Sequence, residues 1–435
     1  MNKVYNYYIY VAYILLIGSI GSNIANIKIF EDLSLKNLLE LRSLFPLIIL
    51  LINLIILTHQ FKLNFLNYSR HILLFFFWVI LIQIISLIIN RYDFFLLQFI
   101  LGTLSIVSLF TMIFNNNSEK ILSKLLSITF FLIFFLIIIF IYQNPNLSYG
   151  GGWLSVFGYK IINLNSNGFS RYLLFLYIFI YTNQTLSNNL NFFKFLILLA
   201  ISTLIFLYEG RVNIGCLLIV NLVIFLRKTN FFKKILLFIF VSIIPFIFSI
   251  ALQNHYKNNL DLLNFYENRD LLNFSENRFW KTTSNLKNIN HITTGRLEKW
   301  KVILNHKQSM IKVIIGNGPE FDRYLLEKNF GNKIGSDSAN VILYFYLCGG
   351  LLSLILLLLL IIKQFHKMCK DFIRNDFHTY KSNHEVFVSA VCLMYLLIRS
   401  LFENSFGVWS IDQIFFILFA CYLNFFLTKN NKLKN

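Results

Sequence analysis

Arginine recurs at the ends of the apolar stretches of this 435-residue chain. The four arginines in such positions are Arg171, Arg211, Arg296 and Arg399. A guanidinium group is planar, always charged and offers paired N–H donors that match the oxygens of a phosphate group. Held in a dry site, such groups stabilise the negative charge that develops on a departing diphosphate. The pattern therefore indicates a site that binds a diphosphate and helps it to leave.

Residues around Arg296 are candidates to complete such a site. The segment TTGRLEKW predicts a helix capped by Thr294, with Arg296 in its first turn and Trp300 one turn later on the same face. A cation in the first turn opposes the helix dipole, so we expect an anion between Arg296 and the free N–H groups. Trp300 would cover this anion or pack on a sugar ring. The alternative is a solvated Arg296 on a surface helix that Trp300 anchors.

Two carboxylates are candidates for a catalytic base. Asp337 lies in SDSAN at the start of a predicted helix, three residues before Asn340 and on the same face. Its alternative role is the N-cap of that helix. Glu403, just after a predicted span, is the second candidate. Because a diphosphate is a good leaving group, the reaction needs charge stabilisation more than a strong acid.

Two of the arginines also have simpler explanations. Arg171 is expected about one turn inside a helix, where it either extends to the lipid headgroups or faces a polar cavity. Arg211 lies between two apolar runs, close to Glu209, and could simply pair with it. The neighbouring Gly210 and Gly215 let the backbone approach a ligand closely, which favours a binding role for Arg211.

The elements that must position these residues are predicted to be membrane helices. Hydrophobic residues make up 57% of the chain and charged residues 14%, against about 45–50% and about 25% in soluble domains. We predict an all-α integral membrane protein with about twelve transmembrane helices, built from apolar runs near 20 residues that can cross about 30 Å of hydrocarbon. The spans at 168–182, 192–208 and 212–226 are short, so the number of helices lies between eleven and thirteen. The predicted spans cover residues 5–20, 43–59, 71–89, 94–114, 121–142, 168–182, 192–208, 212–226, 231–252, 338–362, 384–402 and 408–427.

The distribution of basic residues predicts the orientation of these spans. The net charge is +19, but lysine and arginine gather in alternate short loops, as the positive-inside rule describes. Both termini are therefore expected in the cytoplasm, and the charge indicates membrane insertion rather than binding of nucleic acid. The resulting regions are an N-terminal membrane scaffold (1–142), an outward loop (143–167), a second set of spans (168–252), a large outward loop (253–336), and C-terminal spans with a cytoplasmic tail (337–435).

The two outward loops are expected to differ. Residues 143–167 contain a glycine triplet and clustered asparagines, which predict turns rather than a helix. In the large loop, DLLNFYENR (261–269) is followed at once by DLLNFSENR (270–278), a duplication to which we assign no chemistry. The large loop then continues as the helix after Thr294, which the glycines of IIGNGPEF are expected to end. The sequence contains no phosphate-binding loop, zinc motif or paired-cysteine motif, and we predict no metal and no cofactor.

The order of the polar motifs resembles that of a known family. Between about residues 160 and 410 the chain carries NSNGFSRY, EGR, GRLEKW, IIGNGPEF and SDSAN, the last opening a span that contains LCGG. With the predicted spans and one large outward loop, this order is similar to that of the bacterial O-antigen polymerase (Wzy) family. That family is related to the O-antigen ligases and belongs to the GT-C-type membrane glycosyltransferases. Ligases carry a histidine where this chain has Ala339, which favours a polymerase.

The resemblance implies a specific reaction at the outer face of the bacterial inner membrane. A hydroxyl group of one undecaprenyl-diphosphate-linked repeat unit would attack the anomeric carbon of another chain's reducing sugar, and undecaprenyl diphosphate would leave. The implied partners are the two lipid-linked oligosaccharides, the membrane lipid, a chain-length regulator and a flippase. Arg211 and Arg296 would hold the diphosphate. The residues implied in diphosphate and sugar binding are Arg171, Arg211, Arg296, Trp300, Asn340 and Arg399.

The alternatives are an O-antigen ligase and a flippase for lipid-linked oligosaccharides. A flippase should carry polar groups deep in several helices, and the first five predicted spans contain almost none. A large outward loop with an amphipathic helix also suits an enzyme better than a rocking transporter. We therefore expect a metal-independent glycosyltransferase.

Overall fold

A computed structural model describes most of the predicted helices and part of the large loop. The described residues are 3–20, 41–59, 72, 75–82, 84–85, 95–115, 119–143, 152–156, 159–164, 166–186, 192–207, 211–226, 239–252, 296–318, 321–330, 338, 340–374, 384–403 and 410–434. The tandem repeat at 261–278, Asp337 and Thr294 lie outside them.

Each predicted span contains described helix. In the first half of the chain the helices are α1 (Lys3–Ile20), α2 (Leu41–His59), α4 (Phe95–Asn115), α5 (Glu119–Gln143), α6 (Ser166–Leu186), α7 (Phe192–Leu207) and α8 (Arg211–Leu226). Then come the π-helical turn η3 (Ile239–Ile243), the short helices α13 (Arg296–Leu304), α14 (Met310–Ile315) and α15 (Phe321–Phe330), and the long helices α16 (Val341–Arg374), α18 (His384–Ser400) and α19 (Ile411–Lys434).

Two of the described helices are long and apolar enough to cross a membrane. These stretches are Lys120–Gln143 in α5 and Val341–Met368 in α16. The other described apolar helices are shorter, such as Phe192–Leu207 in α7 and Val212–Val223 in α8. The short length predicted for the spans at 192–208 and 212–226 is therefore confirmed.

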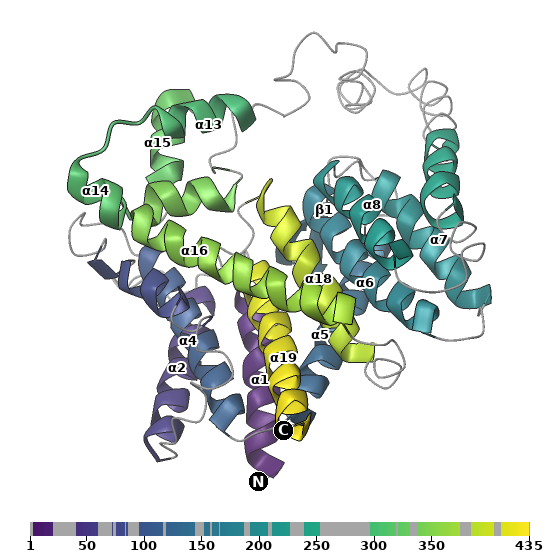
Figure 1. The fold of residues 1–435 in the computed structure, drawn as a ribbon, viewed down its shortest axis with the longest axis horizontal. Coiled ribbons are helices and arrows are strands. Elements are labelled where there is room, and N and C mark those ends of the chain that lie inside the picture. Colours follow the sequence, from purple (N-terminus) through teal and green to yellow (C-terminus); the bar gives the residue numbers. More distant parts are fainter. Residues whose placement is uncertain are drawn as a thin grey trace.

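Helices α18 and α19 form the centre of the bundle (Figure 1). Nearly every residue of α18 from Val386 to Leu397 is buried, and so is the run Ile411–Phe426 of α19. Helix α18 contacts α6, α8, α16 and α19, while α19 also contacts α1 and α5. The two chain ends lie at the same end of the bundle, and α13–α15 lie at the opposite end (Figure 1).

One β-hairpin interrupts the helices, an exception to the predicted all-α architecture. Strand β1 (Gly152–Val156) pairs antiparallel with β2 (Tyr159–Leu164), with an irregular register after Leu154. The glycines and asparagines of 143–167 predicted turns only. The segments WLSV and YKIINL between them are rich in the aromatic and β-branched residues that favour strands, and two residues between strands suit a hairpin.

Polar groups also lie inside the first helices, contrary to expectation. Tyr8 of α1 donates a hydrogen bond to Asn53 Oδ1 of α2 at 2.7 Å, and Asn53 Nδ2 donates to Ser108 Oγ of α4 at 2.8 Å. Tyr13 and Thr129 join α1 to α5 at 2.7 Å. All of these groups are neutral. They act as links between helices, because interhelical hydrogen bonds and small residues hold apolar helices together where hydrophobic burial contributes little.

The glycine-containing loop after α14 docks into a break in α16. Gly350 has φ 68° and ψ −176°, so the helix is interrupted there. Such a break deprives preceding carbonyl groups of their usual donors four residues later. Leu347 O instead accepts from Asn317 N at 3.1 Å and Asn317 Nδ2 at 3.0 Å, and Cys348 O accepts from Gly318 N at 2.9 Å. The motifs IIGNGPEF and LCGG thus form one joint between the short helices and α16.

Two glycines make this joint sterically possible. Gly316 and Gly350 both have positive φ, at 86° and 68°. A Cβ atom on Gly316 would collide with the backbone of Cys348, and one on Gly350 would collide with the backbone of Ile314. Only a residue without a side chain fits where two backbones approach this closely.

We expect Gly350→Ala to destabilise the protein strongly. The left-handed backbone alone costs about 1–3 kcal/mol for a residue with a side chain, and the collision with Ile314 adds to it. The matched control is Gly18→Ala in α1, where a Cβ meets nothing within 4 Å and the helix gains up to about 1 kcal/mol. Thermal unfolding in detergent, followed by tryptophan fluorescence, measures both. Equal unfolding temperatures for the two variants would show that the joint is not needed.

Candidate functional site

One buried carboxylate joins two of the four predicted arginines. Asp412, in the first turn of α19, accepts a hydrogen bond from Arg171 Nη1 of α6 at 3.0 Å and a short one from Arg399 Nη1 of α18. Its side chain is 1% exposed, and those of Arg171 and Arg399 are 16% and 6% exposed. The guanidinium of Arg171 also lies over the ring of Tyr172, with its central carbon 4.8 Å from the ring centroid. Two positive charges therefore share one negative charge in a largely dry place.

This cluster is suited to bind an anion. Removing charges from water costs several kcal/mol each unless partners and hydrogen bonds compensate. Here one carboxylate serves two guanidinium groups, and Arg171 Nε is buried without an acceptor among the described residues. A phosphate oxygen would supply an acceptor for this buried N–H group. The arrangement can therefore hold an oxyanion and stabilise charge that develops on it.

Sequence reasoning missed Asp412. It is the one charged residue of the predicted span 408–427, and that was the available signal, since an ionisable group inside a span usually faces a partner or a cavity. Of the two alternatives for Arg171, the structure has the one that faces inward, toward Asp412. Arg171 is near the start of α6, Arg399 near the end of α18 and Asp412 near the start of α19. These ends meet because α18 packs against both neighbours.

A buried hydrogen-bond network brings the start of α8 to the same place. Asn213 Nδ2 donates to Ser170 Oγ at 2.7 Å, and Tyr395 donates its hydroxyl hydrogen to Asn213 Oδ1 at 2.9 Å. Ser170 precedes Arg171, and Tyr395 lies one turn before Arg399. Arg211 is the first residue of α8, two residues before Asn213, so its backbone begins beside the cluster. Its side chain lies outside what the structure describes.

Arg296 is paired with the second candidate base. Arg296 begins α13, as predicted for the first turn, and its Nη2 donates to Glu403 Oε1 at 2.7 Å. Both side chains are partly exposed. Glu403 lies just after the end of α18, where its N–H donates to Arg399 O at 2.9 Å. The Arg296–Glu403 pair and the buried cluster are thus one helical turn apart along the end of α18.

Asn340 and Trp300 hold the surrounding segments together. Asn340 Oδ1 accepts from the N–H groups of Ile342 and Leu343, at 2.8 and 3.1 Å, so Asn340 caps α16. Its Nδ2 donates to Leu401 O at 2.8 Å, just after α18. The indole N–H of Trp300 donates to Ser338 O at 3.0 Å. Both residues lie around the Arg296–Glu403 pair, and both have structural partners.

The helix that begins at Arg296 is shorter than predicted. It ends at Leu304 instead of continuing to the glycines of IIGNGPEF, and a separate helix, α14, ends at Ile315, directly before Gly316. Lys299 and Ile303 face the protein, whereas Leu304 is exposed. The break arises at residues 305–309, NHKQS, which carry none of the apolar spacing that a buried helical face requires.

Asp322 is a second buried carboxylate that the sequence did not single out. It lies on α15 directly after the motif IIGNGPEF, and its side chain accepts from Ser338 N at 2.9 Å and from Cys348 Sγ at 3.7 Å. These bonds connect α15 to the segment before α16 and to the glycine joint. Because its contacts tie backbone segments together, we assign Asp322 a structural role.

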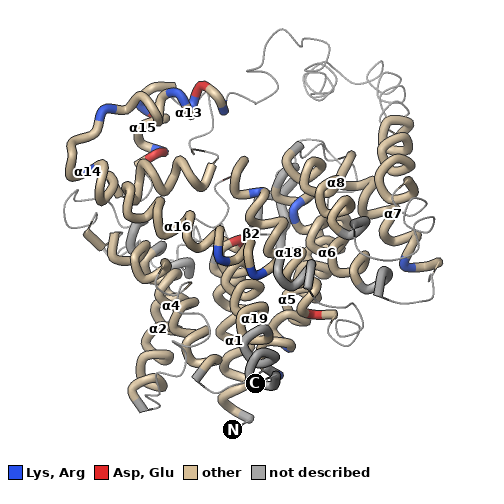
Figure 2. The backbone as a smooth tube through the Cα atoms, viewed as in Figure 1, with Lys and Arg blue, Asp and Glu red and all other residues tan. Residues whose placement is uncertain are grey.

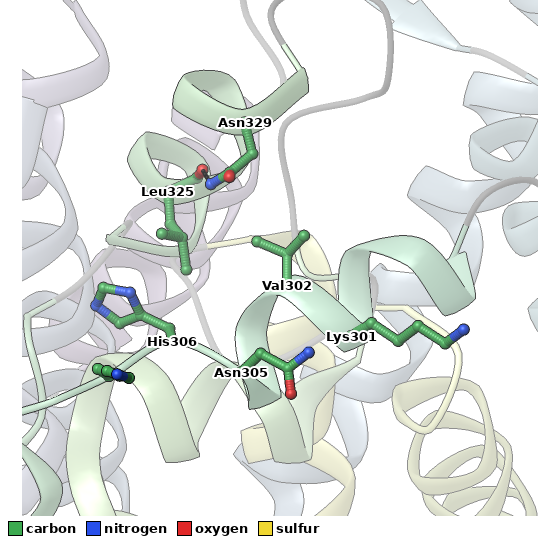
Figure 3. A pocket seen from close by; sticks show the side chains of 7 residues that line it. Lys301, Val302, Asn305, His306, Leu325 and Asn329 are labelled. Carbon is green, nitrogen blue, oxygen red and sulfur yellow. Dashed lines mark hydrogen bonds between the residues drawn. The ribbon is translucent and has the colours of Figure 1, made fainter.

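A polar pocket lies on another face of α13 (Figure 3). It encloses about 340 Å³ between α13 and α15, and Val302 and Leu325 extend toward the space between the two helices. His306 lines it as well, and burial together with the charges of Lys312 and Lys328 lowers the pKa of its imidazole. Two lysines are among the residues that line the pocket, and no carboxylate is among them. None of the predicted site residues lines this pocket. The pocket is therefore distinct from the arginine cluster. The lining residues are Lys301, Val302, Asn305, His306, Lys307, Leu325 and Asn329.

Comparisons with known proteins add no relative. The chain matches no family model, no curated protein and no solved structure.

A double-mutant cycle tests the buried cluster. Asp412→Asn leaves two buried cations without their carboxylate and is expected to lower the free energy of unfolding by about 3–5 kcal/mol. Adding Arg399→Gln removes one of these cations, so the double variant should be more stable than Asp412→Asn alone. Denaturant unfolding in detergent measures the coupling. The control Tyr395→Phe removes one neutral hydrogen bond and should cost about 1 kcal/mol. If the changes in unfolding free energy caused by Asp412→Asn and Arg399→Gln simply add in the double variant, Asp412 and Arg399 do not interact in the way proposed.

Proposed function

We propose that this chain is a membrane glycosyltransferase that polymerises a surface polysaccharide, such as O-antigen, at the outer face of the bacterial inner membrane. Its substrates would be undecaprenyl-diphosphate-linked repeat units, transferred en bloc. The observation that carries the proposal is the cluster in which Arg171 and Arg399 share the buried Asp412. A surplus of positive charge at the end of apolar helices suits the diphosphate of a lipid-linked donor, whose lipid tail needs an apolar surface.

The proposed reaction exchanges one bond at the anomeric carbon of the donor. A hydroxyl oxygen of the acceptor repeat unit attacks this carbon and forms the new glycosidic bond. The bond between the same carbon and the diphosphate oxygen breaks, and undecaprenyl diphosphate leaves with the electron pair. The hydroxyl proton passes to a carboxylate. Because the diphosphate carries the developing charge, arginines held rigidly beside it lower the barrier most.

The Arg296–Glu403 pair offers a way to connect binding with proton transfer. Without donor, Arg296 is neutralised by Glu403 at 2.7 Å. In the proposed mechanism Arg296 donates its hydrogen bond to the diphosphate instead of to Glu403. The carboxylate of Glu403 can then accept the hydroxyl proton. Asp337 stays the other candidate for the base. The cluster around Asp412, one turn away along α18, would hold the second phosphate group.

Arginine variants test the diphosphate site in cells. We expect Arg211→Ala and Arg296→Ala each to abolish long-chain polymer while the protein still inserts into the membrane, because losing one preorganised donor costs about 100- to 1000-fold in rate. Gel analysis of surface polysaccharide from a complemented deletion strain gives the chain lengths. Lys328→Ala removes an exposed positive charge on α15 and is the matched control, with wild-type chain lengths expected. Wild-type chains from both arginine variants would refute the diphosphate site.

Deletion of the gene separates this function from its alternatives. Surface polysaccharide limited to single repeat units supports a polymerase. Loss of all lipid-A-linked antigen would indicate an O-antigen ligase instead. Repeat units trapped inside the cell would indicate a flippase. The neutral polar links of α1, α2 and α4 do not by themselves favour the flippase, since they bond to one another.

A further inference from the structure

Helix α14 turns apolar side chains away from the protein. Met310, Ile311 and Ile314 are 82%, 68% and 45% exposed, and Leu304, at the end of α13, is 60% exposed. No residue of α14 is buried. Large apolar side chains gathered on one surface mark a contact with a partner or with a membrane, because removing apolar surface from water is favourable.

The charges around these side chains are all positive. Lys301, Lys307 and Lys312 are exposed, and the sequence contains no acidic residue between Glu298 and Glu320. Apolar side chains with lysines beside them are typical of segments that lie in the interface of a membrane, where the lysines meet anionic headgroups. Figure 2 shows basic residues along α13–α15, together with acidic residues on α13 and α15.

The exposed surface of α14 continues onto a helix that is long and apolar enough to cross a membrane. Ile314 lies against Gly350 at the break in α16, and Leu351, Leu352 and Ile355 come directly after it with exposed side chains. Figure 1 shows α14 beside the end of α16, at the edge of the bundle. A lipid layer that covers these residues of α16 therefore reaches α14 without a gap.

We propose that the segment Leu304–Ile315 lies in the outer leaflet of the membrane. Its apolar side chains are among the acyl chains, and Lys307 and Lys312 lie at the phosphates of anionic headgroups. The segment anchors the short helices α13–α15 at the height of the arginine site. This proposal rests on the membrane topology of the proposed function and not on the polymerase activity.

Spin-label depth measurement on the full chain in lipid nanodiscs tests the proposal. A nitroxide at Ile311→Cys is compared with one at Glu327→Cys, on the exposed surface of α15, and one at Ile355→Cys, on α16. All three are placed in a Cys369→Ser background, since Cys216, Cys348, Cys392 and Cys421 are buried. At position 311 we expect high accessibility to oxygen and low accessibility to a water-soluble nickel chelate, as at 355, with the opposite at 327.

Each other outcome overturns the proposal in a distinguishable way. A label at 311 that is as accessible to nickel as the label at 327 shows that the segment lies in water. A label at 311 shielded from both reagents shows that a protein, such as a second copy of the chain, covers it. If the label at 355 is also accessible to nickel, the membrane topology itself is wrong, whatever the enzyme does.

The lipid charge tests the role of the lysines. Lys307→Gln with Lys312→Gln should shift the insertion of the 311 label several-fold toward water in nanodiscs that contain phosphatidylglycerol. In nanodiscs of phosphatidylcholine alone the same substitutions should have little effect. An equal shift in both lipids contradicts binding to anionic headgroups. Lys328→Gln, which removes one positive charge from α15, is the control and is compared with each single variant, Lys307→Gln and Lys312→Gln.

Discussion

A single buried carboxylate determines how the central helices of this protein meet. Asp412 can stay charged out of water only if cations and hydrogen bonds surround it, and Arg171 and Arg399 come to it from two other helices. The ends of α6, α18 and α19 must therefore lie at the same height. That constraint also positions the residues just after α18, including Glu403, whose N–H is bonded to the carbonyl of Arg399. The oxyanion site that we propose lies where these helix ends converge.

The short helices are attached to this centre by hydrogen bonds as well as by buried apolar side chains such as Ile303 and Leu326. The loop at Asn317 replaces the missing hydrogen bonds of α16, and its close approach requires Gly316 and Gly350. Asn340 and Trp300 add bonds between the start of α16, the end of α18 and α13. These hydrogen bonds hold α13 beside the end of α18 and the start of α16. Arg296 can therefore donate its hydrogen bond to Glu403. The outer side of α14 stays exposed.

The two sides of this group of helices face different surroundings. Toward the bundle, Arg296 and Trp300 are engaged with Glu403 and Ser338. Away from it, α14 exposes apolar side chains flanked by lysines. If the outer side lies in lipid, as we propose, the arginine site is held at the depth where the diphosphate of a lipid-linked substrate would lie. Membrane anchoring and diphosphate binding would then depend on the same short segment of chain.

Much of the fold could be predicted from the sequence, because apolar run length and helix signals are local properties. They located the helices, the start of α13 near Arg296 and the start of α16 near Asn340. Residue type alone also singled out the arginines, two of which, Arg171 and Arg399, share Asp412. The partners of these arginines could not be predicted, since Arg171 and Asp412 are 241 residues apart and meet only through the packing of α6, α18 and α19. The same holds for the hairpin at 152–164 and for the docking of Asn317 into α16. Ion pairs and backbone docking depend on which helix ends lie side by side, and only the tertiary structure decides that.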